Sequence, residues 1–194
     1  MNEPATDMAS AFEHHDAVEP RHRFPAISFR GETWDLVHLD AFAIRIDPGL
    51  GFEVDVVILF TCHCFSHSFK RDARAPLEIP DDEVFDNGHE RRVLSKERYE
   101  LSRRFLPHLV KDLEKRLVRY AADGASNYFT AEDLSQDPIP GIYAIFFEVE
   151  RDRKRKKRLL LRIQSAYRVD ALSNRLSKAG KIKFATLLRK TYQG

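Results

Sequence analysis

Hydrophobic and polar residues alternate along several stretches of this chain, and alternation of period two predicts β-strands. In the first third of the sequence, turn-forming residues at 30–33 and 47–49 separate three such stretches, residues 27–29, 34–46 and 52–65. The third stretch is apolar on both parities, with Val56 and Ile58 on one face and Val57 and Leu59 on the other. A strand of this kind is expected in the middle of a sheet.

A helical pattern runs from Ser95 to Ala122. Apolar residues recur there at spacings of three and four, and Ser95 is suited to cap the first turn. Pro107 falls inside the pattern and removes a backbone donor, so the sequence predicts either a kinked helix or two helices, the second starting near Pro107. Residues 70–94 are polar and rich in proline, which predicts a long connection.

The last third of the chain again predicts strands. Two of them, Ile142–Glu150 and Leu159–Val169, flank a basic segment, so we expect a β-hairpin with a cationic tip. A final strand is predicted over Lys181–Leu188. Strands, a helical segment and further strands indicate an α+β fold, with a mostly antiparallel β-sheet packed against a kinked or two-part helical layer.

The sequence predicts one domain with a leader. Residues 1–24 hold two prolines, five acids and no regular period, so we expect a disordered acidic leader, or else an acidic flap that lies on the basic C-terminal region. Residues 25–194 then form a single α+β domain. Cys62 and Cys64 are the only cysteines and do not make a disulfide framework. With no secretory signal and no membrane-spanning run, the expected location is the cytoplasm.

Positive charge is concentrated at the C-terminal end. Residues 151–194 carry 15 Lys and Arg against two acids, whereas residues 1–150 carry 17 against 28. This asymmetry predicts a nucleic-acid partner, with RNA favoured, and no membrane. The nucleic-acid-binding residues that we predict lie in the hairpin tip and in the strands after it: Arg151, Arg153, Lys154, Arg155, Lys156, Lys157, Arg158, Arg168 and Lys181. The alternative is a solubilising loop that keeps a sheet edge from aggregating.

The strand after the tip carries polar residues on one parity. Arg162, Gln164 and Arg168 are expected to project together, and Lys181 and Lys183 of the final strand could line up beside them. Such a face suits a phosphate and the charge that develops when a phosphodiester is cleaved. The alternative is the ordinary solvent face of a half-buried sheet. Ser165 and Tyr167 share the opposite parity with Leu161 and Ile163, so they are either substrate contacts or a buried pair.

The segment Cys62-His63-Cys64 admits several interpretations. On a strand, Cys62 and His63 would point to opposite faces, which argues against a metal site and against a Cys–His nucleophile pair. We therefore predict no metal and no cofactor. His63 or His67 could instead act as an acid–base group at a strand end. The remaining possibility is that the cysteines are small core residues and the histidines are structural.

Residues 57–65, Arg98-Tyr99-Glu100-Leu101-Ser102 with Leu106-Pro107, and Ser165-Ala166-Tyr167 resemble a group of small bacterial and phage-associated proteins, some described as stationary-phase growth adaptation proteins. A strand with Ser-x-Tyr after a basic hairpin also resembles the barnase/EndoU/colicin/RelE-like ribonuclease toxin fold. That resemblance implies metal-independent RNA cleavage, with catalytic roles for His63, Arg162, Ser165, Tyr167 and Lys183. The sequence departs from it in placing His63 before the helix.

Two hypotheses follow. In the first, the protein binds RNA through its basic hairpin and is a metal-independent ribonuclease of the toxin type, with a neutralising protein partner. In the second, it is a non-catalytic protein that binds nucleic acid or an acidic partner, and its histidines are structural.

Overall fold

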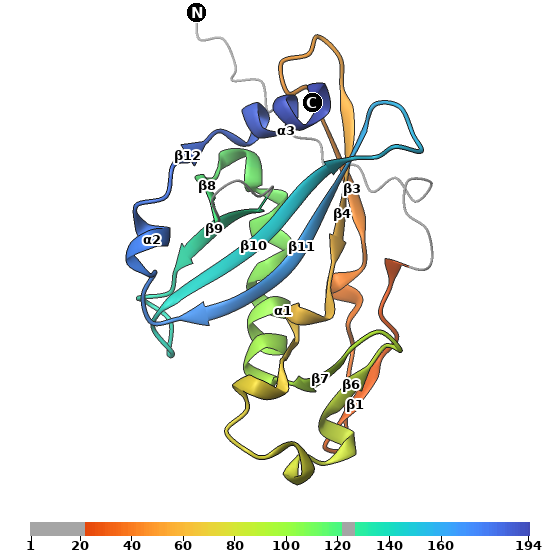
Figure 1. Cartoon of the computed structure of the whole chain (residues 1–194), viewed down its shortest axis with the longest axis vertical. Coiled ribbons are helices and arrows are strands. Elements are labelled where there is room, and N and C mark those ends of the chain that lie inside the picture. Colours follow the sequence, from red (N-terminus) through yellow and green to blue (C-terminus); the bar gives the residue numbers. More distant parts are fainter. Residues whose placement is uncertain (1–21, 122–126) are drawn as a thin grey trace, which may run out of the picture.

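The structure, a computed structural model, describes residues 22–121 and 127–194 and has the α+β fold that the sequence predicts (Figure 1). The strands of the main sheet are β3 (Phe42–Ile46), β4 (Val54–Phe60), β8 (Val118–Tyr120), β9 (Asn127–Asp133), β10 (Ile142–Arg151), β11 (Arg158–Val169) and β12 (Lys181–Ile182). They lie in the order β12-β8-β9-β10-β11-β4-β3. β11 and β4 run parallel, and the other neighbouring pairs are antiparallel.

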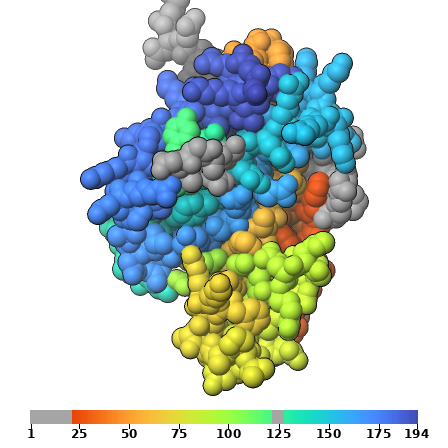
Figure 2. All heavy atoms as spheres, viewed as in Figure 1, coloured from red at the N-terminus to blue at the C-terminus, as the bar shows by residue number. Residues whose placement is uncertain are grey.

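A smaller lobe, residues 66–94, projects from this body (Figure 2). Its sheet is built from β5 (Ser66–His67), β7 (Arg91–Leu94) and β6 (Val84–Asp86), in that order. The hairpin of β1 (Ile27–Phe29) and β2 (Glu32–Trp34) forms a two-stranded sheet of its own, and its residues Phe29 and Trp34 pack in the core. Short 3-10 helices fill the connections: η3 (Val37–Leu39), η4 (Cys62–Cys64), η5 (Phe69–Arg71), η6 (Pro76–Glu78), η7 (Asp81–Glu83) and η8 (Leu113–Lys115).

Helix α1 (Lys96–Lys111) begins where the sequence predicts and ends earlier. The Ser95 hydroxyl accepts a hydrogen bond from the backbone N–H of Arg98 and caps the first turn. The helix passes through Pro107 undivided, so the second helix predicted near that residue is wrong. Beyond Lys111 the chain forms η8 and then β8, although leucines there keep helical spacing.

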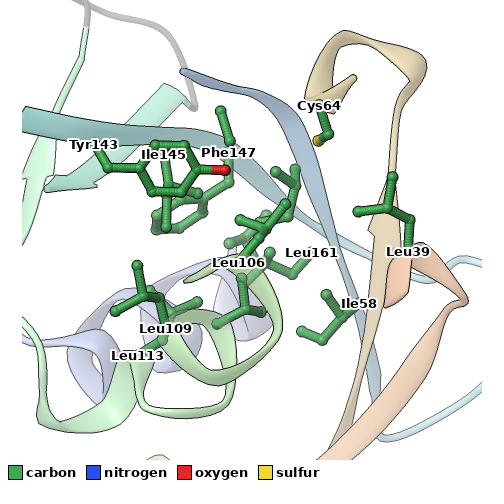
Figure 3. Packing of buried hydrophobic residues seen from close by; sticks show 14 of the residues in the cluster. Leu39, Ile58, Cys64, Leu106, Leu109, Leu113, Tyr143, Ile145, Phe147 and Leu161 are labelled. Atoms are coloured by element: carbon green, nitrogen blue, oxygen red, sulfur yellow. The ribbon is translucent and has the colours of Figure 1, made fainter. Parts of the chain in front are cut away.

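The core lies between α1 and the main sheet (Figure 3). Leu106 and Leu109 of α1 pack against the sheet face that carries Ile145, Phe147 and Leu161, and all five side chains are buried. Burying such side chains contributes about 1.5–3 kcal/mol each. Strand β4 lies between β11 and β3 and is buried on both faces, as its sequence predicts.

A β-bulge reverses the alternation along β11. Phe146 pairs with Ser165 but Phe147 pairs with Ile163, so Gln164 is an extra residue in the ladder. As a result Ile163 and Ala166 both face the core. Ser165 and Tyr167 therefore lie on the same face as Arg162, and Arg168 lies on the opposite face. The predicted grouping of Arg162 with Arg168, and of Ser165 and Tyr167 with Ile163, is wrong for this reason.

The predicted final strand is mostly a helix. β12 covers only two residues, and α3 (Phe184–Gln193) follows it. Phe184, Leu187 and Leu188 are buried and recur at helical spacing, so helix formation buries all three on one face. The four-residue helix α2 (Asn174–Ser177) lies in the preceding connection.

Most of the predicted leader, residues 1–21, lies outside the described residues. Its last three residues belong to the fold. The ring of Phe24 meets that of Phe65 edge-on at 5.2 Å, and Arg23 forms an ion pair with Asp40 at 3.5 Å. Within the described ranges, no helix is long and apolar enough to cross a membrane.

Candidate functional site

The cationic tip consists of Arg153, Lys154, Arg155, Lys156 and Lys157, all exposed in the turn between β10 and β11. Its base is fixed by a buried ion pair, in which Arg158 Nε donates to Asp152 Oδ2 at 2.7 Å. Asp152 Oδ1 also accepts from the backbone N–H of Lys154 at 2.8 Å. Lys157 has a positive φ of 54°, which closes the turn. The tip is therefore a defined turn that presents five cations to solvent.

The charge on Asp152 belongs to this arrangement. Burial raises its pKa, but the hydrogen bond from the Lys154 backbone and the charge of Arg158 oppose burial and bring the pKa below its usual value. Asp152 is therefore ionised at neutral pH and holds the two ends of the turn together.

Two hollows flank the tip. One, of about 360 Å³, lies on the outer face of the sheet. It is lined by two acids, Glu150 and Asp152, by two leucines, and by His22, Arg151, Arg153, Lys154, Arg158 and Arg162. The other, of about 490 Å³, lies against α3, and its charged lining residues are Glu150, Arg151, Arg153 and Lys190. Arg151 lines both hollows, and its Cζ lies 4.7 Å from the centroid of the Tyr192 ring. Cations therefore extend from the tip to Lys190 of α3, and Figure 2 shows the segment around the tip beside the C-terminal helix.

Arg162 is held by acids of the neighbouring strand. Its Nε donates to Glu148 Oε1 at 3.1 Å, and its Nη2 lies 3.7 Å from Glu150 Oε1. Gln164 donates to the other oxygen of Glu148 at 2.8 Å. The predicted phosphate clamp is therefore already occupied by two carboxylates.

The remaining basic residues predicted beside Arg162 lie elsewhere. Lys181 is in the edge strand β12, and Lys183 is the N-cap residue of α3. Three strands separate β12 from β11, about 19 Å at the usual strand spacing, so the predicted alignment is wrong. Arg168 binds Glu97 at 2.7 Å and Asp170 at 2.8 Å. These residues therefore do not form one site with Arg162, as their predicted nucleic-acid-binding and catalytic roles would require.

His63 and Cys62 meet at one carboxylate. Strand β4 ends before them, and in η4 both side chains reach Glu90, which lies 3.1 Å from His63 Nε2 and 3.1 Å from Cys62 Sγ. The prediction that Cys62 and His63 point to opposite faces is wrong, because it assumed that the strand continues through them. The three donor atoms lie within 4.8 Å of one another, so thiolate, imidazole and carboxylate could together hold a soft or borderline metal such as zinc.

In this structure the thiol of Cys62 is protonated and donates a hydrogen bond to Glu90. Burial, followed by the hydrogen bond to Glu90, raises the pKa of Cys62 to about 12. Burial also raises the pKa of Cys64 to about 12. Both cysteines are free and buried, so neither is a ready nucleophile at neutral pH.

Arginines that the sequence did not single out surround the far end of β11. Arg98 lies 4.7 Å from the ring centroid of Tyr167 and Arg71 lies 5.3 Å from it. Arg92 and Glu90 come from a segment predicted only as a connection. The pairing of β5 with β7 brings Glu90 to His63 and Arg92 to Ser66, and a contact set by long-range pairing leaves no local pattern in the sequence.

Of three kinds of comparison with known proteins, one places the chain. Searches of curated proteins and of solved structures find no match. A family model, however, matches residues 26–192, which include the hairpin, the His63 cluster and both larger helices. The chain belongs to the YjaZ family.

Proposed function

We propose that this protein binds RNA through the cationic tip and the adjoining surface of α3. The observation that carries the proposal is the tip itself. Arg153, Lys154, Arg155 and Lys156 are exposed on an ordered turn and make no ion pair with any residue in the described part of the chain. Cations without counter-ions on a fixed turn can each neutralise a backbone phosphate and release its counter-ion.

The hollows beside the tip support the same proposal. Each is lined by several cations, and the hollow at α3 also contains Tyr128. A single-stranded nucleic acid needs a cationic track with aromatic surface on which bases can stack. The free, buried cysteines suit the cytoplasm, where such a partner is found.

The geometry supports RNA binding better than RNA cleavage. A ribonuclease needs its acid–base groups and its phosphate clamp around one scissile bond. His63 binds Glu90 and Arg162 binds Glu148, whereas Lys183 lies at the N-cap position of α3, so these groups do not converge. We therefore favour the non-catalytic hypothesis, in which the tip binds RNA and His63 is structural.

The test compares two triple variants of equal charge. Lys154, Arg155 and Lys156 are changed to Gln in one protein, and Lys115, Lys178 and Lys181 in the other. Binding of a labelled single-stranded RNA is measured by fluorescence anisotropy over a range of salt concentrations. We expect the tip variant alone to lose affinity, and its log–log salt slope to shrink by about 0.7 per phosphate contact removed.

Equal losses in the two variants would show that only net charge matters and would overturn the proposal. The same RNA, incubated with the unmodified protein and examined by gel, tests cleavage. Cleavage that is lost on changing His63 to Ala would restore the catalytic hypothesis.

A further inference from the structure

A buried guanidinium at the junction of the body and the lobe makes no ion pair with a described carboxylate. Arg98 is 8% exposed, and its Nη1 donates to the backbone carbonyls of His63, at 2.9 Å, and Ser66, at 2.8 Å. Burial of a charge is costly unless an opposite charge compensates it. Two carbonyl dipoles compensate only part of that cost.

The two charged side chains that act most strongly on Arg98 are also cations, Arg71 and Arg92. Arg92 shares the Ser66 carbonyl with it, through an Nη2–O distance of 3.5 Å, and donates from Nε to the Ser66 hydroxyl at 2.9 Å. Arg71 shares the ring of Tyr167 with it. Burial first, and then the charges of Arg71 and Arg92, lower the pKa of Arg98 to about 10.

The helix adds to the positive potential. Arg98 lies in the first turn of α1, where the helix dipole places partial positive charge and where a cation is unfavourable. An arginine is therefore kept at a position where burial, two neighbouring arginines and the helix end all oppose its charge.

Among the described acids around this cluster, Glu90 pairs with one of its arginines, and Glu97 and Asp72 pair with arginines outside it. Glu90 binds His63 and Arg92. Glu97 binds Arg168 at 2.7 Å, and Asp72 binds Arg74 at 2.9 Å. Three guanidinium groups against the single carboxylate of Glu90 leave a net charge of about +2, which matches that of a phosphate dianion.

We propose that Arg71, Arg92 and Arg98, beside Tyr167, bind the phosphate group of a small-molecule ligand. Guanidinium forks match the tetrahedral oxygens of phosphate, and a bound dianion would supply the compensating charge that Arg98 lacks. The exposed Arg71 gives the ligand access from solvent. The ring of Tyr167 contacts both Arg71 and Arg98 and holds the two guanidinium groups side by side.

This site is separate from the cationic tip. Tyr167 lies nine residues beyond Arg158 on β11, which is about 30 Å along an extended strand. The phosphate site can therefore be tested independently of RNA binding, and either proposal can fail while the other stands.

The experiment uses inorganic phosphate as the probe. Phosphate is titrated into the full chain by calorimetry, and the Tm is measured in parallel. Sodium chloride keeps the ionic strength constant. Acetate, titrated in the same way, tests whether a carboxylate binds as well. We expect saturable binding of phosphate with a rise in Tm, and no comparable response to acetate. Arg71→Gln should weaken phosphate binding at least tenfold.

Arg103→Gln is the matched control. Arg103 is also exposed and also stacks on a tyrosine, Tyr99, at 5.9 Å, so its loss removes the same charge and the same type of contact. The control should bind phosphate like the unmodified protein. The tip variant with Lys154, Arg155 and Lys156 changed to Gln should do so too.

Three outcomes would overturn the proposal: no saturable phosphate binding, an equal response to acetate, or equal losses in Arg71→Gln and Arg103→Gln. Arg98→Lys adds a second comparison, because it keeps the charge and removes the fork. If that variant does not fold, the comparison of Arg71 with Arg103 still decides, since both side chains are exposed.

Discussion

Arg162 donates a hydrogen bond to Glu148 at 3.1 Å across the β10–β11 pair, and this contact determines what the outer face of the hairpin can do. The arginine is 42% exposed and the glutamate 32%, so the pair contributes only about 0–1 kcal/mol to stability. It nevertheless cancels the charge that a phosphate clamp would need. The positive surface of the hairpin is therefore the tip and not the strand that follows it.

The first prediction concerns this pair and RNA affinity. Arg162→Ala should lower the affinity for RNA less than twofold, because its charge is already compensated. Glu148→Gln should raise the affinity, because it leaves the guanidinium with only the more distant Glu150. Fluorescence anisotropy in low salt measures both. A loss in Arg162→Ala as large as that of the tip triple variant would contradict this account.

The second prediction concerns the base of the tip. Asp152→Ala should destabilise the fold by about 3 kcal/mol, because it leaves Arg158 buried without this carboxylate. Asp152→Asn should cost less, because its amide oxygen can still accept from the Lys154 backbone. Urea unfolding of the three proteins at neutral pH gives the comparison. Equal stability of the alanine variant and the unmodified protein would show that the pair is not needed for the turn.

Asp152 also has a predictable pH dependence. Its folded pKa lies below its unfolded value, so the stabilisation is present above an unfolded pKa of about 3.9 and is lost as the pH falls through the folded pKa. The difference in unfolding free energy between the unmodified protein and Asp152→Asn should therefore shrink below about pH 4.

The hairpin could be predicted from sequence because its signals are local. Apolar and polar residues alternate along each strand, and a run of Lys and Arg lies between the strands, all within thirty residues. The bulge at Gln164 has no such signal, and one extra residue is enough to exchange the faces of Tyr167 and Arg168. The predicted pairing of Ser165 with Tyr167 therefore holds, but the residues expected on their face, Leu161 and Ile163, lie on the opposite one.

The final strand shows how two patterns compete. Lysines alternate with Ile182 and Phe184 over the first four residues, which is the strand signal. Leu187 and Leu188 continue a helical spacing from Phe184, and burying all three outweighs the short alternation. The His63 cluster could not be found at all from local patterns, because Glu90 and Arg98 are brought to it by strand pairing and helix packing.

The third prediction uses His38. Burial first, and then the charge of Arg103, lower its pKa to about 4, and its Nε2 lies 2.9 Å from the Ser102 hydroxyl. The unfolded chain, with a pKa of about 6.5, binds this proton more readily, so stability should be complete above pH 6.5 and fall as the pH drops from 6.5 to 4. We expect the free energy of unfolding to fall by on the order of 1 kcal/mol over this pH range, because solvent screens the partly buried ring.

His38→Gln should flatten this part of the stability profile, because glutamine does not titrate. His89→Gln, at an exposed position, is the control and should leave the profile unchanged. Urea midpoints measured at half-unit steps from pH 4 to pH 7.5 provide the data. If the urea midpoints of the unmodified protein and of the His38→Gln variant fell equally as the pH drops, groups other than His38 would cause the acid sensitivity.

The last prediction concerns the thiols. With the pKa of Cys62 and Cys64 raised to about 12, fewer than about one in a thousand thiols is ionised at pH 8. Labelling of the native protein by a disulfide reagent should therefore be at least a hundredfold slower than labelling in urea. The carboxylate of Glu90 contributes to the raised pKa of Cys62, so Glu90→Gln should speed native labelling of one thiol and leave the second protected. Fast labelling of both thiols in the unmodified native protein would mean that η4 opens readily, and the contacts of His63 and Arg98 in that segment would then be transient as well.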